Sequence, residues 1–158
     1  IIHTTVRIYD QMNDIKERIK GHEGYRLEPY LCTEGHKTGG YGHKILDGEE
    51  IPTTQDGWEK LFDQDFTKAH DGATTLIYEH LTGTDFSELD DKKKYIVEGV
   101  LTEMCFQLGQ SGVRKFRKMF TALSKCDFKE AGSQMRDSLW HKQTPARCKE
   151  LSHIIQNL

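Results

Sequence analysis

Hydrophobic residues recur at helical spacing near the start of the chain, between charged and polar neighbours. The apolar positions over residues 4–20 are Val6, Ile8, Met12, Ile15 and Ile19. Steps of three or four residues place them on one face, so the pattern predicts an amphipathic helix. Gly21 and Gly24 are expected to end this helix, which puts Glu23 at its C-terminus. The negative end of the helix dipole favours a protonated carboxyl group there.

Residues 25–52 are the one region with a β pattern. Weakly alternating runs around Leu27–Leu31, Lys37–Tyr41 and Ile45 are separated by glycine and proline residues. We therefore expect short strands and tight turns in this part of the chain.

All later segments carry helical patterns. A long helix is expected over residues 54–81, with Thr53 or Thr54 as its N-cap. The strongest apolar repeat predicts a buried helix in the C-terminal half that stops at Gly109–Gly112. The expected elements after it are helices at Val113–Ser124 and Phe128–Leu139, a turn at Trp140–Pro145, and a last helix with Thr144 as N-cap.

These elements predict an α+β, mostly helical fold with two lobes and a cleft between them. The N-terminal lobe, about residues 13–60, contains the hairpin region, and the helix at about 54–81 leads to an all-helical lobe at about 82–158. A chain of 158 residues can bury a core of its own without disulfides or a metal. We expect one domain in total.

Composition and charge exclude several classes of function. No apolar run approaches the roughly 20 residues of a membrane helix, and the start of the chain lacks the pattern of a secretory signal peptide. Residues 1–90 hold 9 Lys+Arg against 18 Asp+Glu, and residues 91–158 hold 13 against 7. The second half therefore offers a basic surface either to an anionic polymer or to the acidic half. No basic run is interleaved with aromatic residues, which disfavours nucleic acid.

Cysteine and histidine spacing predicts neither a metal site nor a cofactor. The four cysteines, Cys32, Cys105, Cys126 and Cys148, contain no CxxC pair, and the eight histidines are scattered. Reduced thiols are the expected state of the four cysteines.

The candidate chemistry is concentrated in a glycine-rich stretch, residues 21–43. Glu23, Cys32 and Thr38 place a carboxyl group, a thiol and a hydroxyl on a backbone that glycines bend into tight turns. Such turns often carry active sites. A glycine-rich hairpin with incidental polar residues is the alternative interpretation.

Motifs in several segments, in one order along the chain, together resemble a known family. They are Glu23-Gly24 with Arg26-Leu27, Thr33–Gly35 and Thr38 with His43, Glu59–Phe62 with Gln64-Asp65, Phe106-Gln107 with Gly112-Val113, and Trp140 with Gln143–Pro145 and Arg147. This combination resembles the phage-type lysozymes, the endolysins of the T-even phages in glycoside hydrolase family 24. The resemblance covers about residues 12–158 and implies a lysozyme-like two-lobe fold.

The resemblance implies a muramidase, which hydrolyses the β-1,4 bond between N-acetylmuramic acid and N-acetylglucosamine in peptidoglycan without a cofactor. The family pattern of Glu, eight residues, Asp or Cys, five residues, and Thr falls on Glu23, Cys32 and Thr38. It implies Glu23 as the general acid. The residues implied as substrate-binding or as supports of the acid are Phe106, Gln107, Gln143 and Arg147, and His43 with Asp65 is implied as a structural ion pair between the lobes.

Cys32 leaves two mechanisms open. With Thr38 it can position and deprotonate a water molecule, which inverts the anomeric carbon. As a thiolate it can instead attack the sugar, which gives a thioglycosyl intermediate and retention. The presence of Thr38 favours the first mechanism. An inert thiol, or a disulfide from Cys32 that switches activity, are further hypotheses.

Two other functions stay as alternatives. One is a catalytically weak peptidoglycan-binding or phage tail-associated module on the same fold. The other is a lytic transglycosylase, which needs the acid but no partner that activates water. The expected partner is bacterial peptidoglycan, with no nucleic acid and no membrane insertion, and the protein is expected to be a monomer. We expect synthesis in the host cytoplasm and action on the cell wall, in the periplasm or outside.

Overall fold

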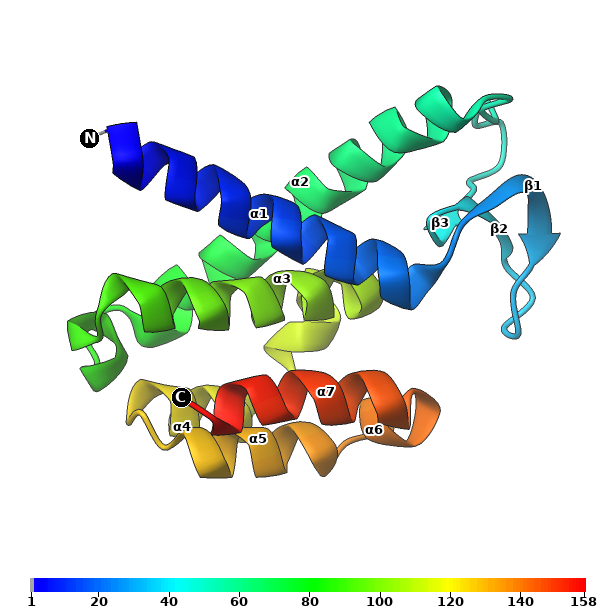
Figure 1. Cartoon of the computed structure of the whole chain (residues 1–158). Coiled ribbons are helices and arrows are strands. Elements are labelled where there is room, and N and C mark those ends of the chain that lie inside the picture. The colour runs from blue at the N-terminus through cyan, green and yellow to red at the C-terminus, as the bar shows by residue number, and fades with distance from the viewer. Residues whose placement is uncertain (1) are drawn as a thin grey trace. The chain divides into compact units, whose positions relative to one another are not determined.

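The computed structural model describes residues 2–158, with side chains from residue 11 onward. In this part of the chain, three strands form one antiparallel sheet and the other regular elements are helices (Figure 1). The expected α+β, mostly helical fold class is confirmed. The chain divides into two compact units, and the boundary lies within a long helix, between Lys68 and Ala69. None of the described helices is long and apolar enough to cross a membrane.

The first unit begins with helix α1 and continues with the sheet. Its elements are α1 (Ile2–Glu23), β1 (Arg26–Leu31), β2 (Lys37–Gly40), β3 (His43–Lys44) and the first part of α2 (Gln55–Leu81). The side chains of Val6 and Ile8, which the amphipathic pattern includes, lie outside the described residues. The predicted N-cap is confirmed at Thr54, whose Oγ1 accepts a hydrogen bond from the Gly57 N–H at 3.1 Å. The strand expected around Ile45 is present as β3, which ends at Lys44, one residue before Ile45.

A small aromatic core holds the sheet of the first unit against α2. Trp58, Phe62 and Phe66 are almost fully buried, and Ile19 of α1 is fully buried. The Trp58 indole packs on the backbone of Gly39 and Gly40 so closely that a Cβ atom on either glycine would collide with the ring. The Trp58 Nε1–H donates to the Leu27 carbonyl of β1 at 3.0 Å. The two glycines of β2 therefore leave the space in which Trp58 packs against the hairpin and holds it in place.

The second unit is helical throughout. Its elements are the end of α2, the 3₁₀ helix η1 (Asp85–Glu88), α3 (Asp91–Arg114), α4 (Arg117–Ser124), α5 (Phe128–Arg136), α6 (Leu139–Gln143) and α7 (Pro145–Gln156). The core is centred on α3, as its apolar repeat predicted, and Val97, Val100 and Met104 are at most 1% exposed. Figure 1 shows α5 and α7 side by side, in agreement with their extensive packing.

Several expectations for this unit are wrong in detail. Gly109 leaves the helical conformation (φ 75°, ψ 158°), but α3 resumes directly after it and ends at Arg114. The segment predicted as a turn at Trp140–Pro145 contains the short helix α6. The predicted N-cap position of α7 is confirmed at Thr144, with Pro145 at the start of the helix, although the Thr144 side chain makes no capping hydrogen bond. Its hydroxyl instead donates to the Trp140 carbonyl at 3.3 Å, a local contact that competes with capping.

Candidate active site

Glu23 is the last residue of α1, as the glycine pattern predicted. The Gly24 N–H closes the final turn on the Lys20 carbonyl at 2.9 Å. Gly24 has φ 71°, in the left-handed region that glycine enters at little cost, so the helix stops and the chain turns into β1. The Glu23 side chain is half-buried. A carboxyl group therefore lies at the junction of a helix and a sheet, partly shielded and still reachable from solvent.

Gly42 makes room for the Glu23 carboxyl group. Gly42 lies in the turn between β2 and β3 and has φ 72°. A Cβ atom at this position would collide with the Oε2 atom of Glu23 and would lie 3.0 Å from its Cδ. The side chain of Glu23 is thus in close contact with the glycine turn, and any larger residue at position 42 would displace it. This contact joins the helix end to the hairpin.

The same hairpin brings Cys32 and Thr38 to one face. Tyr30 of β1 pairs with Thr38 of β2, and the Cys32 N–H donates to the His36 carbonyl at 2.9 Å. Cys32 follows Tyr30 by two residues, and side chains two apart on a strand share a face. Cys32 and Thr38 are therefore diagonal neighbours across the hairpin. The predicted thiol and hydroxyl come together through strand register.

The turn after β1 surrounds the Cys32 sulfur with donors. The His36 N–H donates to Sγ at 3.3 Å. Burial acts to raise the pKa of the thiol, and the nearby Glu34 carboxylate acts in the same sense. Hydrogen bonds from the backbone of His36 and of Glu34 and from Thr38 outweigh them, so the pKa of Cys32 lies below its ordinary value. The site therefore favours the thiolate more than a free cysteine does.

The Thr38 hydroxyl has one proton and two acceptors within reach. Thr38 is only 4% exposed, and its Oγ1 donates to the His36 carbonyl at 3.0 Å. While that bond is made, the hydroxyl cannot also donate to Cys32, so the backbone N–H groups are the steadier donors to the sulfur. The lone pairs of Oγ1 remain able to accept a hydrogen bond from a water molecule.

The residues predicted to bind substrate or support the acid lie in the second unit. Gln107 accepts from the Trp140 indole at 2.9 Å and donates to the Thr144 hydroxyl at 3.2 Å. Arg147 is 8% exposed and donates from Nε to the fully buried Glu103 at 2.7 Å. Phe106 packs against the helical core. The structure thus brings Gln107, Trp140 and Thr144 into one network and gives Arg147 a buried acidic partner.

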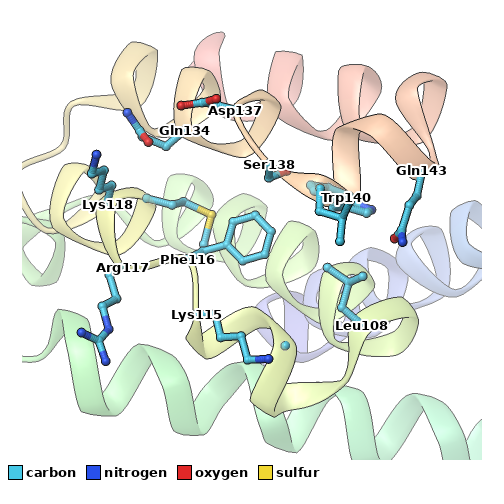
Figure 2. Close-up of a pocket in the computed structure, with 13 residues that line it drawn as sticks. Leu108, Lys115, Phe116, Arg117, Lys118, Gln134, Asp137, Ser138, Trp140 and Gln143 are labelled. Carbon is cyan, nitrogen blue, oxygen red and sulfur yellow. The ribbon is translucent and has the colours of Figure 1, made fainter.

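Gln143 lines a pocket of the second unit. The pocket has a volume of about 560 Å³, within the range of small-molecule sites. Figure 2 shows Phe116 and Trp140 facing each other across its interior, with Gln143 at one end and Gln134 and Asp137 above. Among the basic residues that line it, Arg117 and Lys118 lie at the end away from Gln143, and Lys115 lies below Phe116. The pocket is apolar inside and polar at its margin.

His43 forms the expected ion pair, but not between the two units. Its Nδ1 lies 2.7 Å from the Asp65 carboxylate, and its Nε2 lies 2.9 Å from that of Glu49. All three residues belong to the first unit. The predicted pair is confirmed, and its assignment as a link between lobes is wrong, because the unit boundary falls beyond Asp65.

Several residues that shape the site are not singled out by the sequence pattern alone. Gly42 is one of many glycines in residues 21–43, and the absence of its side chain is what admits the Glu23 carboxyl group. Glu103 was not singled out, although a charged residue inside the strongest apolar repeat of the chain is a signal of a buried partner. In the described part of the chain, no group of three or more His, Cys, Asp or Glu side chains is arranged to hold a metal ion.

Comparison with known proteins gives consistent results. The phage lysozyme family matches residues 20–153. A protein of Dictyostelium discoideum named probable T4-type lysozyme 2 is 28% identical over 92% of this chain and 95% of its own length. The pre-baseplate central spike protein Gp5 of Enterobacteria phage T4 is 29% identical over 88% of this chain and 27% of its own length. The peptidoglycan hydrolase gp36 of Pseudomonas phage phiKMV is 28% identical over 80% of this chain and 13% of its own length.

The family match and the relatives together define a glycoside hydrolase of the lysozyme class, whose substrate is the peptidoglycan of the bacterial cell wall. The match extends over most of the sequence and includes the glycine-rich hairpin, α2 and the C-terminal helices. The chain belongs to the phage lysozyme family.

Proposed function

We propose that the protein is a muramidase that cleaves the β-1,4 bond between N-acetylmuramic acid and N-acetylglucosamine, with Glu23 as general acid and Cys32 and Thr38 activating water. One observation supports this assignment most strongly. The Glu23 carboxyl group lies against Gly42, in the hairpin that also carries Cys32 and Thr38 on one face. A proton donor and a water-activating pair are therefore joined through a few residues of one hairpin.

The chemistry follows from the two kinds of group. Glu23 donates its proton to the glycosidic oxygen as the bond from that oxygen to the anomeric carbon breaks. A water molecule forms the new bond to the anomeric carbon, and the Cys32 thiolate accepts the proton that this water loses. Thr38, whose own proton is directed to the His36 carbonyl at 3.0 Å, accepts a hydrogen bond from the same water. The anomeric carbon is inverted.

Direct attack by the Cys32 thiolate is the competing mechanism. It would form a carbon–sulfur bond and retain the configuration after hydrolysis. The anomer released in the first turnovers, measured by NMR, separates the two mechanisms. Inversion supports water activation, and retention with a trapped glycosyl adduct on Cys32 supports the nucleophile.

In the second unit, we propose that Gln143 binds substrate. We propose that Gln107 fixes the position of the segment that contains Gln143. Gln143 is exposed and lines the pocket shown in Figure 2, while Gln107 is bonded to Trp140 and Thr144 on either side of it. Phe106 and Arg147 are proposed as supports, since Phe106 packs on the core and Arg147 is anchored by Glu103. We also propose a monomer that is made in the host cytoplasm.

The decisive test is the Glu23→Gln variant in a turbidity assay on purified peptidoglycan. We expect it to lose about a hundredfold or more of the rate, the scale of general acid catalysis. Glu28→Gln is the matched control, because Glu28 is exposed on the neighbouring strand. A Glu23→Gln enzyme that clears the suspension at the wild-type rate contradicts the assignment. Anhydro-sugar products in place of reducing ends would identify a lytic transglycosylase.

A second candidate function has support from one relative. The T4 central spike protein contains a segment similar to this chain within a much longer protein. Under this second proposal, the domain is a wall-degrading or wall-binding part of a larger phage protein. Saturable binding of the wild-type chain to peptidoglycan without release of soluble fragments would favour a binding module, whereas fragment release favours the enzyme.

A further inference from the structure

We propose that Tyr41 is a positioning residue for the general acid, because it holds in place the glycine turn against which the Glu23 carboxyl group lies. The inference rests on the proposed role of Glu23. It concerns a side chain that makes no contact with the reacting groups in the proposed mechanism and acts through its neighbour Gly42.

The turn has little stiffness of its own. Strand β2 ends at Gly40 and β3 begins at His43, so Tyr41 lies between two glycines. Gly40 and Gly42 have φ values of 57° and 72°, a region open mainly to glycine, and glycine also has the most backbone freedom to lose. Tyr41 is the one residue of the turn with a side chain that can anchor it.

The Tyr41 hydroxyl is anchored through a carboxylate to helix α1. It donates to Oε1 of Glu59 at 2.7 Å, and the Lys20 ammonium donates to Oε2 of the same carboxylate at 2.7 Å. Burial, and then the bond to Glu59, raise the pKa of Tyr41, so its hydroxyl keeps its proton and remains a donor. The Lys20 and Tyr41 hydrogen bonds, in that order, lower the pKa of Glu59, which stays charged. The bridge is therefore charge-assisted.

The Tyr41 ring is also held from several sides. Its centroid lies 5.0 Å from that of Tyr25 and 5.4 Å from that of Phe62. The Lys20 ammonium lies 5.0 Å from the Tyr41 centroid. Aromatic pairs and a cation over a ring each add stabilisation beyond simple burial. Tyr41 thus joins the turn to α2 through Phe62 and Glu59, and to α1 through Lys20.

Both ends of this arrangement meet at Glu23. Lys20 precedes Glu23 by one helical turn, and its carbonyl accepts the N–H of Gly24 at 2.9 Å. On the other side, Gly42 follows Tyr41 directly and contacts the Glu23 carboxyl group. The carboxyl group therefore lies between the end of helix α1 and the glycine turn. The Lys20–Glu59–Tyr41 bridge connects these two segments. Loosening the bridge lets the turn shift and widens the range of carboxyl positions.

The test is a double-mutant cycle of Tyr41→Phe and Glu59→Met, which removes the acceptor, with kcat and KM measured on soluble, uncrosslinked peptidoglycan chains. Tyr41→Phe keeps the ring and removes the hydroxyl. We expect about a tenfold lower kcat with KM within about twofold of wild type, because small misplacement of a catalytic group acts on the chemical step. The double variant should lose no more activity than Glu59→Met alone, since both changes remove the same Tyr41–Glu59 hydrogen bond. Tyr78→Phe, at a position that is 75% exposed, should match wild type.

Three outcomes overturn the proposal: a wild-type kcat in Tyr41→Phe, losses that multiply in the double variant, or a kcat that falls only in proportion to the folded fraction measured by circular dichroism. Glu23→Gln in the same assay keeps the two assignments separate. If it is inactive while Tyr41→Phe turns over normally, only the role of Tyr41 fails. If Glu23→Gln is active, the general acid is misassigned and the role of Tyr41 fails with it.

Discussion

The four cysteine side chains have different surroundings, and only one of them favours the thiolate. The pKa of Cys32 is lowered by the turn that follows β1. Burial raises the pKa of Cys105 to about 12 and that of Cys148 to about 11, and it also raises the pKa of Cys126. Cys148 additionally donates its S–H to the Met135 carbonyl at 3.3 Å. At neutral pH the reactive sulfur is therefore concentrated at Cys32.

Alkylation with iodoacetamide at pH 7 should modify Cys32 first and reduce the rate of peptidoglycan clearing at least tenfold, because the modified sulfur cannot accept a proton. Peptide mass spectrometry identifies the modified residue. Cys126→Ser is the control, and it should remain as sensitive as the wild type. Cys32→Asp should stay active and become resistant to the reagent. Full activity with Cys32 completely alkylated would remove this residue from the mechanism.

Gly42 is the second residue whose role is specific. Gly42→Ala should lower clearing at least tenfold, because the added methyl group displaces the Glu23 carboxyl group. Gly48→Ala is a matched control, since Gly48 also has a positive φ of 78° but has nothing within 4 Å of the added atom. Both variants carry the same backbone cost of about 1 kcal/mol. Equal activity of the two variants would mean that contact with Gly42 does not position the acid.

At the scale of elements, the hairpin is tied to its surroundings by His43. Its imidazole lies between the carboxylates of Asp65 on α2 and Glu49 in the following loop. The hydrogen bond to Asp65 raises the pKa of His43 most, burial opposes it, and the charges of Asp65 and Glu49 add to the increase. The protonated form therefore links strand β3 to a helix and a loop.

This link makes stability depend on pH in a defined direction. A raised pKa in the folded state means that the contribution is complete below the ordinary histidine pKa of about 6.5 and is lost as pH rises through the folded value. His43→Asn should therefore cost about 2 kcal/mol at pH 5.5 and clearly less at pH 9. Thermal melts of both proteins across this range measure the difference. His153→Asn, at an exposed position, is the control, and a cost independent of pH would contradict the prediction.

At the scale of the whole molecule, the unit boundary changes the distribution of charge. Divided at residue 90, the chain has an acidic and a basic part, but the unit up to Lys68 holds 9 Lys+Arg against 13 Asp+Glu, and the unit from Ala69 holds 13 against 12. The acidic residues between positions 69 and 90 fold with the basic C-terminal helices. The basic surface that the sequence suggested is thus largely neutralised within its own unit.

The buried pair of Glu103 and Arg147 is the main charged contact inside the second unit's core. Glu103→Gln leaves the Arg147 charge without its carboxylate, and breaking such a pair costs about 3 kcal/mol or more. The melting temperature should fall by roughly 6–12 °C for a chain of this size. Glu50→Gln, at an exposed loop position, is the control. A variant as stable as the wild type would show that the pair adds nothing to stability.

Most elements could be predicted because their signals are local. The amphipathic repeats identified α1, α2 and the central helix α3, and Gly24 marked the end of α1 beside Glu23. The exceptions were Gly109, after which α3 resumes, and the segment at Trp140, where a side-chain contact to Gln107 holds a short helix. Such contacts override the weak preference of a few residues for a turn.

Residue spacing and glycine positions act over a few residues, and they were enough to predict the fold class and to place Glu23, Cys32 and Thr38 on a helix end and a hairpin. Three contacts could be seen only in the folded chain: Gly42 admits the carboxyl group, Tyr41 reaches Glu59, and Arg147 has a buried acidic partner. The two hydrogen-bonded contacts join residues 18 and 44 positions apart. Contacts at that separation depend on how the elements pack, and packing follows from many side chains at once.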